Sequence, residues 1–256
     1  MQALITGASS GMGRDMARVL SKKGYDLILV ARRKENLEEL KKELNTKCKI
    51  ISLDLSIEEN VFKLHEQTKN QDIDILINNA GFGLFGLFNE TDLNTELKMI
   101  DLNIKAYHIL TKLFLQDFVK KDKGLILNVC SSAGFMAGPR LSTYYATKNY
   151  VTKLTMAINE ELKFMKSNVV VSALCPGPVA TEFNKVAKGE FSIKEANSYK
   201  VAEYAIKKLF QHKMLIIPTL SMKLTLFLNR FAPYRLSLYI AYHIQYRKET
   251  GGYKNK

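Results

Sequence analysis

Two adjacent tyrosines and a nearby lysine carry side chains that could transfer protons. They lie in STYYATKNY, residues 142–150, as Tyr144, Tyr145 and Lys148. On a helix, spacings of four and three residues both place a tyrosine roughly on the face of the lysine. A tyrosine has a pKa of about 10, and a neighbouring ammonium lowers it by stabilising the phenolate, as acid–base chemistry near neutral pH requires. Helical geometry alone does not decide which tyrosine is active.

A glycine-rich turn, TGASSGMG, follows the first expected strand and precedes an expected helix. Glycines let the backbone turn tightly and approach a pyrophosphate, and a helix N-terminus supplies free amides with a partial positive charge. The spacing is not the G-x-G-x-x-G of the commonest dinucleotide fingerprint, so a simple turn is the alternative. We predict that this loop binds cofactor phosphates. The residues expected to contact them are Gly7, Ser9, Ser10, Gly11, Met12 and Gly13.

Two arginines, Arg32 and Arg33, follow the second expected strand in LVARRKEN. An NAD site usually has an acid here, which binds the ribose 2′-hydroxyl. A guanidinium can instead bind a 2′-phosphate through paired, charge-assisted hydrogen bonds. The arginines therefore favour NADP over NAD, and the alternative is that they cap the following helix.

The chain alternates short β-rich runs with longer helical patterns, as a parallel sheet with crossover helices requires. Most of the strand-like runs are nearly continuous in Val, Ile and Leu, which is typical of strands buried on both faces. The expected strands are Gln2–Thr6, Asp26–Ala31, Cys48–Leu53, Asp74–Asn78, Gly124–Cys130, Asn168–Leu174 and Met214–Ile217. The expected helices are near Gly11–Lys23, Lys34–Asn45, Ile57–Asn70, Leu93–Lys120, Ser142–Lys166 and Tyr199–Gln211.

These elements predict an α/β fold with one doubly wound, Rossmann-like domain, about seven parallel strands and helices on both faces. We assign residues 1–218 to a cofactor-binding catalytic domain and residues 219–256 to a basic, helical C-terminal extension of it. The first strand begins close to the N-terminus, so no cleavable leader is expected. Three dispersed cysteines indicate free thiols in a reducing compartment, and we expect a cytoplasmic protein. The four histidines lack paired ligand spacing, so no metal site is expected.

The net charge of +13 raises the question of nucleic-acid or membrane binding. Many lysines accompany glutamates on expected helix faces, as in KENLEELKKEL, where they would simply solvate the surface. We therefore expect no nucleic-acid partner. The C-terminal part is different, because residues 212–256 contain eight Lys or Arg and the single acid Glu249.

Several motifs resemble those of the short-chain dehydrogenase/reductase family, in that family's order between Gln2 and Ile217. TGASSGMG resembles its cofactor loop, DLS its adenine-contacting turn and NNAG its fourth-strand motif. DLNIKAYH, NVCSSAG, YYATK and PGPVAT resemble the segments with its catalytic asparagine, its serine, its Tyr-x-x-x-Lys pair and its nicotinamide loop. By this resemblance, further cofactor contacts are Asp54, Leu55, Asn79, Ala80, Gly81, Tyr144, Lys148, Pro176, Gly177, Val179 and Thr181.

The resemblance also selects between the tyrosines. The family's serine precedes its tyrosine by thirteen residues, and counting back from Tyr144 reaches Ser131, which also fits the Ser-x-Ala-Gly frame. Counting back from Tyr145 reaches Ser132 and breaks both that frame and the Tyr-x-x-x-Lys spacing. We therefore predict Tyr144 as the acid/base, Tyr145 as a packing residue and Ser132 as a turn residue.

The other catalytic roles follow from chemistry and resemblance together. Lys148 is expected to lower the pKa of Tyr144 by roughly three units and, by resemblance, to hold the nicotinamide ribose. Ser131 is expected to hydrogen-bond the substrate oxygen and stabilise its developing charge. By resemblance, Asn103 would hold a water in a proton relay behind Lys148.

The substrate is less well defined by the sequence. The resemblance places a substrate loop at about residues 182–197, EFNKVAKGEFSIKEAN, which has no ligand-specific pattern. An apolar pocket is one interpretation of the nearby large side chains, and ordinary core packing is the other. These side chains are Phe82, Phe85, Phe135, Met136 and Phe183.

The C-terminal extension, LSMKLTLFLNRFAPYRLSLYIAYHIQYRK, is expected to form two helices broken at Pro233. It is too interrupted for a membrane span, which needs about 20 consecutive apolar residues. Its basic and aromatic residues fit an interfacial helix that contacts a membrane peripherally. Packing over the substrate cleft or against a second subunit is the alternative that we favour.

Together these features predict an NADP(H)-dependent oxidoreductase that interconverts a carbonyl compound and an alcohol. Reduction of the carbonyl compound is the expected direction. The resemblance implies a homodimer or homotetramer and a small-molecule substrate. A catalytically idle NADP-binding or membrane-surface protein is the alternative function. The complete set of Asn103, Ser131, Tyr144 and Lys148 argues against it.

Overall fold

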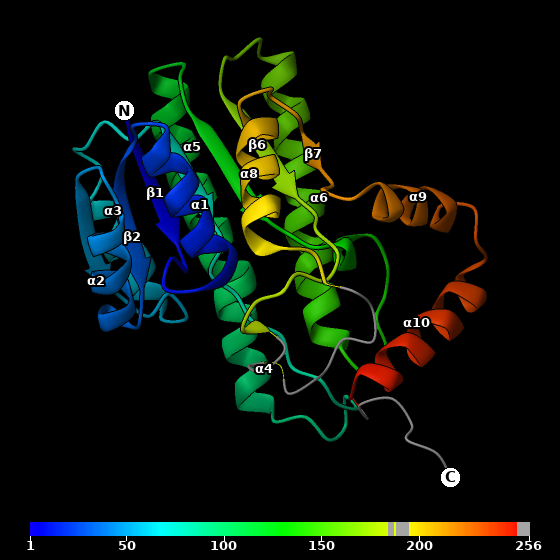
Figure 1. Cartoon of the computed structure of the whole chain (residues 1–256). Helices are drawn as coiled ribbons and strands as arrows, with labels where there is room; N and C mark the ends of the chain where they lie inside the picture. The colour runs from blue at the N-terminus through cyan, green and yellow to red at the C-terminus, as the bar shows by residue number, and fades with distance from the viewer. Residues whose placement is uncertain (184–186, 188–194, 250–256) are drawn as a thin grey trace.

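The computed structural model describes residues 1–183, 187 and 195–249, and its centre is a seven-stranded parallel sheet (Figure 1). The strand order β3-β2-β1-β4-β5-β6-β7 confirms the predicted doubly wound fold. The strands are β1 (Gln2–Thr6), β2 (Asp26–Ala31), β3 (Cys48–Ser52), β4 (Ile75–Asn78), β5 (Leu125–Val129), β6 (Val170–Leu174) and β7 (Leu215–Ile216).

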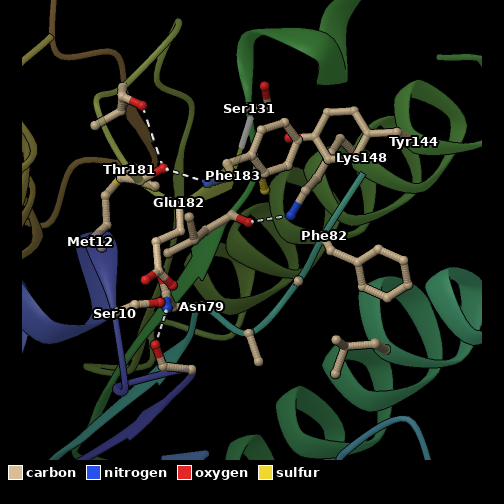
Figure 2. A pocket seen from close by; sticks show the side chains of 18 of the residues that line it. Ser10, Met12, Asn79, Phe82, Ser131, Tyr144, Lys148, Thr181, Glu182 and Phe183 are labelled. Carbon is tan, nitrogen blue, oxygen red and sulfur yellow. Dashed lines mark hydrogen bonds between the residues drawn. The ribbon is translucent and has the colours of Figure 1, made fainter. Parts of the chain in front are cut away.

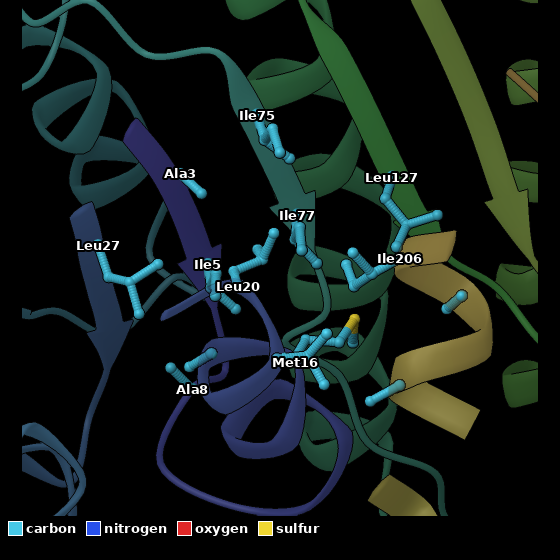
Figure 3. Close-up of a cluster of buried hydrophobic side chains, with 14 of the residues drawn as sticks. Ala3, Ile5, Ala8, Met16, Leu20, Leu27, Ile75, Ile77, Leu127 and Ile206 are labelled. Atoms are coloured by element: carbon cyan, nitrogen blue, oxygen red, sulfur yellow. The ribbon is translucent and has the colours of Figure 1, made fainter. Parts of the chain in front are cut away.

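The central strands are buried on both faces, which explains their apolar sequences. In β1, Ala3 and Ile5 pack into one hydrophobic cluster, while Leu4 between them packs into the other. This alternation follows from the two-residue period of a strand. Figure 3 shows Ile5 of the first cluster beside Met16 and Leu20 from the helix that follows β1.

Helices cover both faces of the sheet, as predicted. One cluster joins the sheet to α1 (Gly11–Lys22), α2 (Lys34–Glu43) and α8 (Ser198–Leu209). The other joins it to α3 (Glu58–Glu66), α5 (Tyr107–Lys120) and α6 (Ser142–Phe164). The two layers leave the carboxyl ends of the strands open.

The helix predicted for Leu93–Lys120 is not continuous. It is divided into α4 (Leu93–Ile100), the π-helix η1 (Asp101–Ala106) and α5. The wider π turn changes the direction of the side chains, and such turns occur frequently at functional sites. Asn103, one of the predicted catalytic residues, lies within it.

The strand order reverses direction at β1, which has β2 on one side and β4 on the other. In doubly wound sheets a ligand binds beyond the carboxyl ends of the strands at this switch point. The loops after β1 and β4 are tied together there, because Thr6 Oγ1 accepts hydrogen bonds from the backbone N–H groups of Asn79 (2.9 Å) and Ala80 (3.2 Å). The fold therefore gathers the predicted cofactor motifs at one edge.

The C-terminal extension forms α9 (Leu220–Asn229) and α10 (Tyr234–Glu249), with the break at Pro233 as predicted. In Figure 1, α9 leads away from the sheet beyond β7, and α10 returns toward the carboxyl ends of the strands. The inner side of α9 contacts the loop after β6, because a Cβ atom on Gly177 would lie 2.6 Å from Met222 Cε. Among the described residues, no helix is both long and apolar enough to cross a bilayer.

Candidate active site

Loops at the carboxyl ends of the strands enclose a cavity of about 390 Å³, a volume within the usual range for small-molecule sites. The loops after β1 and β2 line one part, and the start of α6 lines another. Figure 2 shows Ser10 from the loop after β1 and Tyr144 and Lys148 from α6. The predicted site residues that line it are Gly7, Ser9, Ser10, Gly11, Met12, Arg32, Arg33, Asp54, Leu55, Asn79, Ala80, Gly81, Ser131, Tyr144, Lys148, Pro176, Gly177, Val179 and Thr181.

The glycine loop fits the close approach of a phosphate group. Gly7 has a φ of +67°, and a Cβ atom there would lie 2.8 Å from Ala80 Cα, so only glycine fits the turn between the two loops. The side chain of Asn79 fixes the same turn by donating to the backbone carbonyls of Thr6 (3.0 Å) and Gly7 (3.2 Å). The N-terminus of α1 directs its free amides into this space, as a pyrophosphate requires.

Gly13 has a different role from the one predicted. It does not line the cavity, and a Cβ atom there would lie only 2.4 Å from the carbonyl oxygen of Gly7. The residue therefore lets the first turn of α1 pack against the glycine loop. Its contribution to the cofactor site is indirect.

Arg33 extends across the part of the cavity beside β2. Its guanidinium donates to Ser10 Oγ (2.9 Å) and pairs with Glu182 (2.8 Å). Although Arg33 is the N-cap residue of α2, its side chain makes no capping hydrogen bond. The alternative role as a helix cap is therefore wrong for this side chain.

Arg32 lies beside the loop after β3. Its guanidinium is 3.7 Å from Asp54 Oδ2, and 69% of the side chain is exposed. Asp54 is itself held by Ser56, whose backbone N–H and hydroxyl both donate to Oδ1. The cavity is thus flanked at this end by two guanidinium groups, a fixed carboxylate and the hydroxyl of Ser10, which can contact a ribose and its phosphate.

The helix α6 brings Tyr144 and Lys148 to the other part of the cavity. Ser131, directly after β5, lines the same part of the cavity, and its hydroxyl acts to lower the pKa of Tyr144. Ser131 is placed by close packing of the 3₁₀-helix η2 (Ser132–Phe135) on α6, where a Cβ atom on Gly134 would lie 2.1 Å from Thr152 Oγ1. Ser132 also lines the cavity, but only the Ser131 hydroxyl is close enough to Tyr144 to influence its pKa.

Lys148 is nearly inaccessible to solvent, with 4% of the residue exposed. Its ammonium donates to the carbonyl of Val129 (2.9 Å) and lies 5.8 Å from the centre of the Tyr144 ring. Burial lowers the pKa of Lys148 to about 8. The lysine therefore holds its proton less firmly than a solvated lysine would, although the ammonium still predominates at pH 7.

The expected direction of the Tyr144 pKa shift is not found. Burial raises the pKa of Tyr144 above its usual value of 10, although the hydroxyl of Ser131 acts in the opposite direction. The reason is that removal from water destabilises the phenolate. These protein groups therefore hold the proton on Tyr144.

Asn103 is completely buried behind the cavity and does not line it. Its Oδ1 accepts from the backbone N–H of Phe82 (3.2 Å), while Nδ2 donates to the carbonyl of Phe82 (2.9 Å) and to Thr147 Oγ1 (3.2 Å). These bonds tie the loop after β4 to η1 and α6. In the structure the Asn103 side chain positions these three segments relative to one another. Its role in a water relay stays a prediction.

Tyr145 does more than pack on a neighbouring helix face, because it also lines the cavity. Its ring lies against Gly138, where a Cβ atom would be 2.3 Å from Tyr145 Cδ2. Its hydroxyl accepts a hydrogen bond from Gln245 of α10, which lines the cavity too. The C-terminal extension therefore closes part of the site, in agreement with the favoured alternative of packing over the cleft.

The predicted apolar residues separate into two groups. Phe82 and Phe183 line the cavity, and Phe85 belongs to a small buried cluster against which Tyr144, Tyr145 and Phe183 pack. Phe135 instead packs in a different cluster, so its assignment to the pocket is wrong, and Met136 does not line the cavity. The predicted substrate loop, residues 182–197, lies largely outside the described residues.

Sequence reasoning missed several residues of the site. Glu182 could not be paired with Arg33 because 149 positions separate them, and Gln245 lies 100 positions from its partner. Leu141, directly before α6, is a third missed lining residue. No local motif marks any of them.

A parallel sheet with a dinucleotide cradle at its switch point and a Ser–Tyr–Lys group beside it defines a nicotinamide-dependent oxidoreductase class. Residues 1–190 match the family model described as short chain dehydrogenase. The chain belongs to this family, and the predicted resemblance is confirmed.

One protein sequence and two solved structures illustrate what the chain is similar to. A very-long-chain 3-oxoacyl-CoA reductase from Rattus norvegicus is 30% identical over 195 residues, which are 73% of this chain and 62% of that protein. A structure of a short-chain dehydrogenase from Sphingobium yanoikuyae in complex with NADPH is 30% identical with a TM-score of 0.80, covering 86% of this chain and 88% of that one. A bulky-bulky ketone specific alcohol dehydrogenase from Comamonas testosteroni is 27% identical with a TM-score of 0.77, covering 90% and 92%.

Proposed function

We propose that the protein is an NADP(H)-dependent oxidoreductase that interconverts a ketone or aldehyde and an alcohol, with Tyr144 as the acid/base. The observation that carries this proposal is that Ser131, Tyr144 and Lys148 line the same cavity as the glycine loop, with Lys148 Nζ 5.8 Å from the centre of the Tyr144 ring. A hydroxyl pair of this kind can bind one carbonyl oxygen from two directions. An idle binding protein has no chemical need for the arrangement.

The protein's part in the reaction is proton transfer and positioning. The nicotinamide, when bound, supplies or accepts the hydride. During reduction, Tyr144 donates its proton to the carbonyl oxygen, and the hydroxyl of Ser131 donates a hydrogen bond to the same oxygen as negative charge develops there. Lys148 holds the cofactor ribose and lies close enough to stabilise the phenolate that forms.

The reducing direction is supported by the protonation state of Tyr144. Because burial raises the pKa of this tyrosine, the enzyme carries the phenol form, which is the form that reduction requires at its start. Oxidation would begin with the phenolate, which burial disfavours. We therefore propose that the protein works mainly as a reductase.

NADP is the proposed cofactor because of the charges beside β2. Arg32 and Arg33 flank the place where a ribose 2′-phosphate would lie, and Ser10 adds a hydroxyl donor. The similar structure from Sphingobium yanoikuyae contains NADPH. Glu182 now pairs with Arg33, so the same guanidinium would exchange a carboxylate partner for a phosphate.

The substrate is proposed to be largely apolar. Phe82, Leu141, Tyr145 and Phe183 line the cavity near Tyr144. The names of the rat and Comamonas relatives specify a very-long-chain 3-oxoacyl group and a bulky ketone, both of which place large groups beside a carbonyl. A pocket of this composition fits such a molecule.

The outer surface of the extension supports peripheral contact between this proposed cytoplasmic enzyme and a membrane. Exposed apolar side chains follow one another along α9 and α10, and Phe231 (73% exposed) and Tyr234 (90% exposed) mark the turn between them. Residues 219–248 contain no Asp or Glu, while Lys223 of α9, Arg230 at its end and Arg235 of α10 are exposed. Apolar surface with positive charge complements an anionic lipid surface.

The homodimer or homotetramer predicted by resemblance remains part of the proposal. The apolar surface of α9 and α10 could also bind a second copy of the chain. Charge argues against that use, because two copies would bring positive residues together on an interface without a described acid. Lipid is therefore the proposed occupant.

The test is NADPH consumption by the purified protein with aldehydes and ketones of graded hydrophobicity. Tyr144→Phe should lower kcat/KM at least about 1,000-fold, since it removes the proton donor. Tyr150→Phe is the matched control, because Tyr150 lies on the exposed side of α6 and contacts His108. Full activity in Tyr144→Phe would exclude the proposed mechanism, whereas NADPH binding without turnover of any compound would support the idle alternative.

A further inference from the structure

Glu182 reaches from the loop after β6 to the end of the cavity beside β2. Its Oε2 lies 2.8 Å from a guanidinium nitrogen of Arg33, although 149 positions separate the two residues along the chain. Both residues line the cavity, and their side chains are 50% and 47% exposed, so a ligand can reach the pair. Figure 2 shows the side chain of Glu182 directed toward Ser10 of the glycine loop. The carboxylate therefore occupies the guanidinium to which the 2′-phosphate of NADP is proposed to bind.

The backbone at Glu182 is held on both sides. Before it, Thr181 lies against the glycine loop, because a Cβ atom on Gly11 would be 3.0 Å from Thr181 Cγ2. After it, Phe183 packs against the small buried cluster beside the cavity. The backbone N–H of Phe183 also donates to Thr181 Oγ1 (3.3 Å), which closes a turn around Glu182. The carboxylate thus stays close to the cofactor site whether or not the ion pair is formed.

Positive charge at this end of the cavity is balanced by negative charge. The guanidinium of Arg33 pairs with Glu182, as described above. The guanidinium of Arg32 lies 3.7 Å from Asp54, which Ser56 holds in place. The formal charges of the two guanidinium groups and the two carboxylates cancel where a negatively charged 2′-phosphate would lie. Because charges a few ångströms apart interact strongly in a partly buried site, each carboxylate weakens the attraction for the phosphate.

The two nicotinamide cofactors differ in what they demand of this ion pair. NADH has a ribose 2′-hydroxyl and can bind while Arg33 and Glu182 stay paired. NADPH carries a phosphate that must displace the carboxylate to form its own charge-assisted hydrogen bonds with the guanidinium. A carboxylate that remains near the bound phosphate also repels it. The pair therefore weakens the binding of NADPH relative to that of NADH.

We infer that Glu182 is a specificity-determining residue, whose carboxylate competes with the 2′-phosphate of NADP for Arg33 and so reduces the preference for NADP over NAD. The inference rests on the proposed NADP(H)-dependent function and deepens it. The guanidinium favours the phosphorylated cofactor, and the carboxylate opposes it. Removing the carboxylate should therefore make the protein more selective for NADPH.

The experiment measures the dissociation constants of NADPH and NADH by fluorescence titration and compares their ratio, NADH over NADPH. Glu182→Gln should raise this ratio about 5- to 30-fold, and Glu182→Ala should change it in the same direction. In an Arg33→Gln background the same substitutions should change the ratio less than about twofold, because no guanidinium remains to compete for. Glu160→Gln is the matched control, since it removes a carboxylate of similar exposure that pairs with Lys163 on α6, and it should leave the ratio unchanged.

The ratio separates competition from a structural role. A substitution that only loosened the loop would change both affinities alike and leave the ratio unchanged. An unchanged or lower ratio in Glu182→Gln, with a ratio that Arg33→Gln lowers, would overturn the inference and leave the NADP proposal intact. A rise of equal size with and without Arg33 would also overturn it, because the carboxylate would then act without the guanidinium. If Arg33→Gln does not lower the ratio, the cofactor proposal fails, and the inference fails with it.

Discussion

Replacing Lys148 with methionine should stabilise the protein while it abolishes reduction. The lysine is 4% exposed, and its pKa is lowered to about 8 from 10.5 because burial disfavours the ammonium. Each tenfold change in proton affinity corresponds to 1.36 kcal/mol, so holding the charged lysine in the folded protein at neutral pH costs about 3 kcal/mol. Methionine has a similar length and carries no charge.

The pH dependence isolates this cost. Between pH 8 and 10.5 the unfolded chain binds a proton at residue 148 that the folded protein has lost, so the free energy of unfolding of the wild type rises with pH. The methionine variant lacks this titration. The stability advantage of Lys148→Met should therefore decrease by about 2 kcal/mol between pH 7.0 and 9.5.

Urea unfolding of both proteins, followed by circular dichroism across this pH range, measures the difference directly. Lys163→Met, which removes an exposed lysine of α6 that pairs with Glu160 (2.8 Å), is the control. Two results would refute the reasoning. One is a stability difference for Lys148→Met that is independent of pH, and the other is a difference that grows as the pH rises.

Two further predictions concern the cofactor and the extension. Arg33→Gln should weaken NADPH binding by about 10- to 100-fold and change NADH binding less than threefold, because it removes a charge-assisted contact to the 2′-phosphate. Fluorescence titration measures both affinities, and equal losses for the two cofactors would argue against that contact. Arg18→Gln, which loses a pair with Glu43, serves as the control. Phe231→Ser should weaken cosedimentation with vesicles of phosphatidylglycerol and phosphatidylcholine several-fold. Phe164→Ser, at an even more exposed position (84% against 73%) of α6, should not. No vesicle binding by the wild type, with a dimer that dissociates in Phe231→Ser, would assign the surface to a second copy.

Features that depend on neighbouring residues could be predicted from the sequence. Continuous apolar runs specify strands that are buried on both faces, and the glycine turn and Arg32–Arg33 follow strands whose ends must meet at one edge of a parallel sheet. The spacing of Tyr144 and Lys148 places both on one face of α6. Local backbone geometry dictates each of these relations, so a motif is enough to predict it.

Relations between residues that are distant along the chain depend on the tertiary structure. The pairing of Arg33 with Glu182 and the contact of Gln245 with Tyr145 arise because separate elements converge on one cavity. The π turn at Asn103 likewise follows from packing against the loop after β4. Helical patterning along the sequence could not distinguish it from a regular turn.

The direction of the Tyr144 pKa shift is the clearest case. The spacing from Lys148 correctly brought an ammonium near the tyrosine, but the sequence does not specify how much water remains around the pair. In the folded protein both groups are buried, which raises the pKa of Tyr144 and lowers that of Lys148. Charge proximity is set by local spacing, whereas desolvation depends on everything that packs around the site.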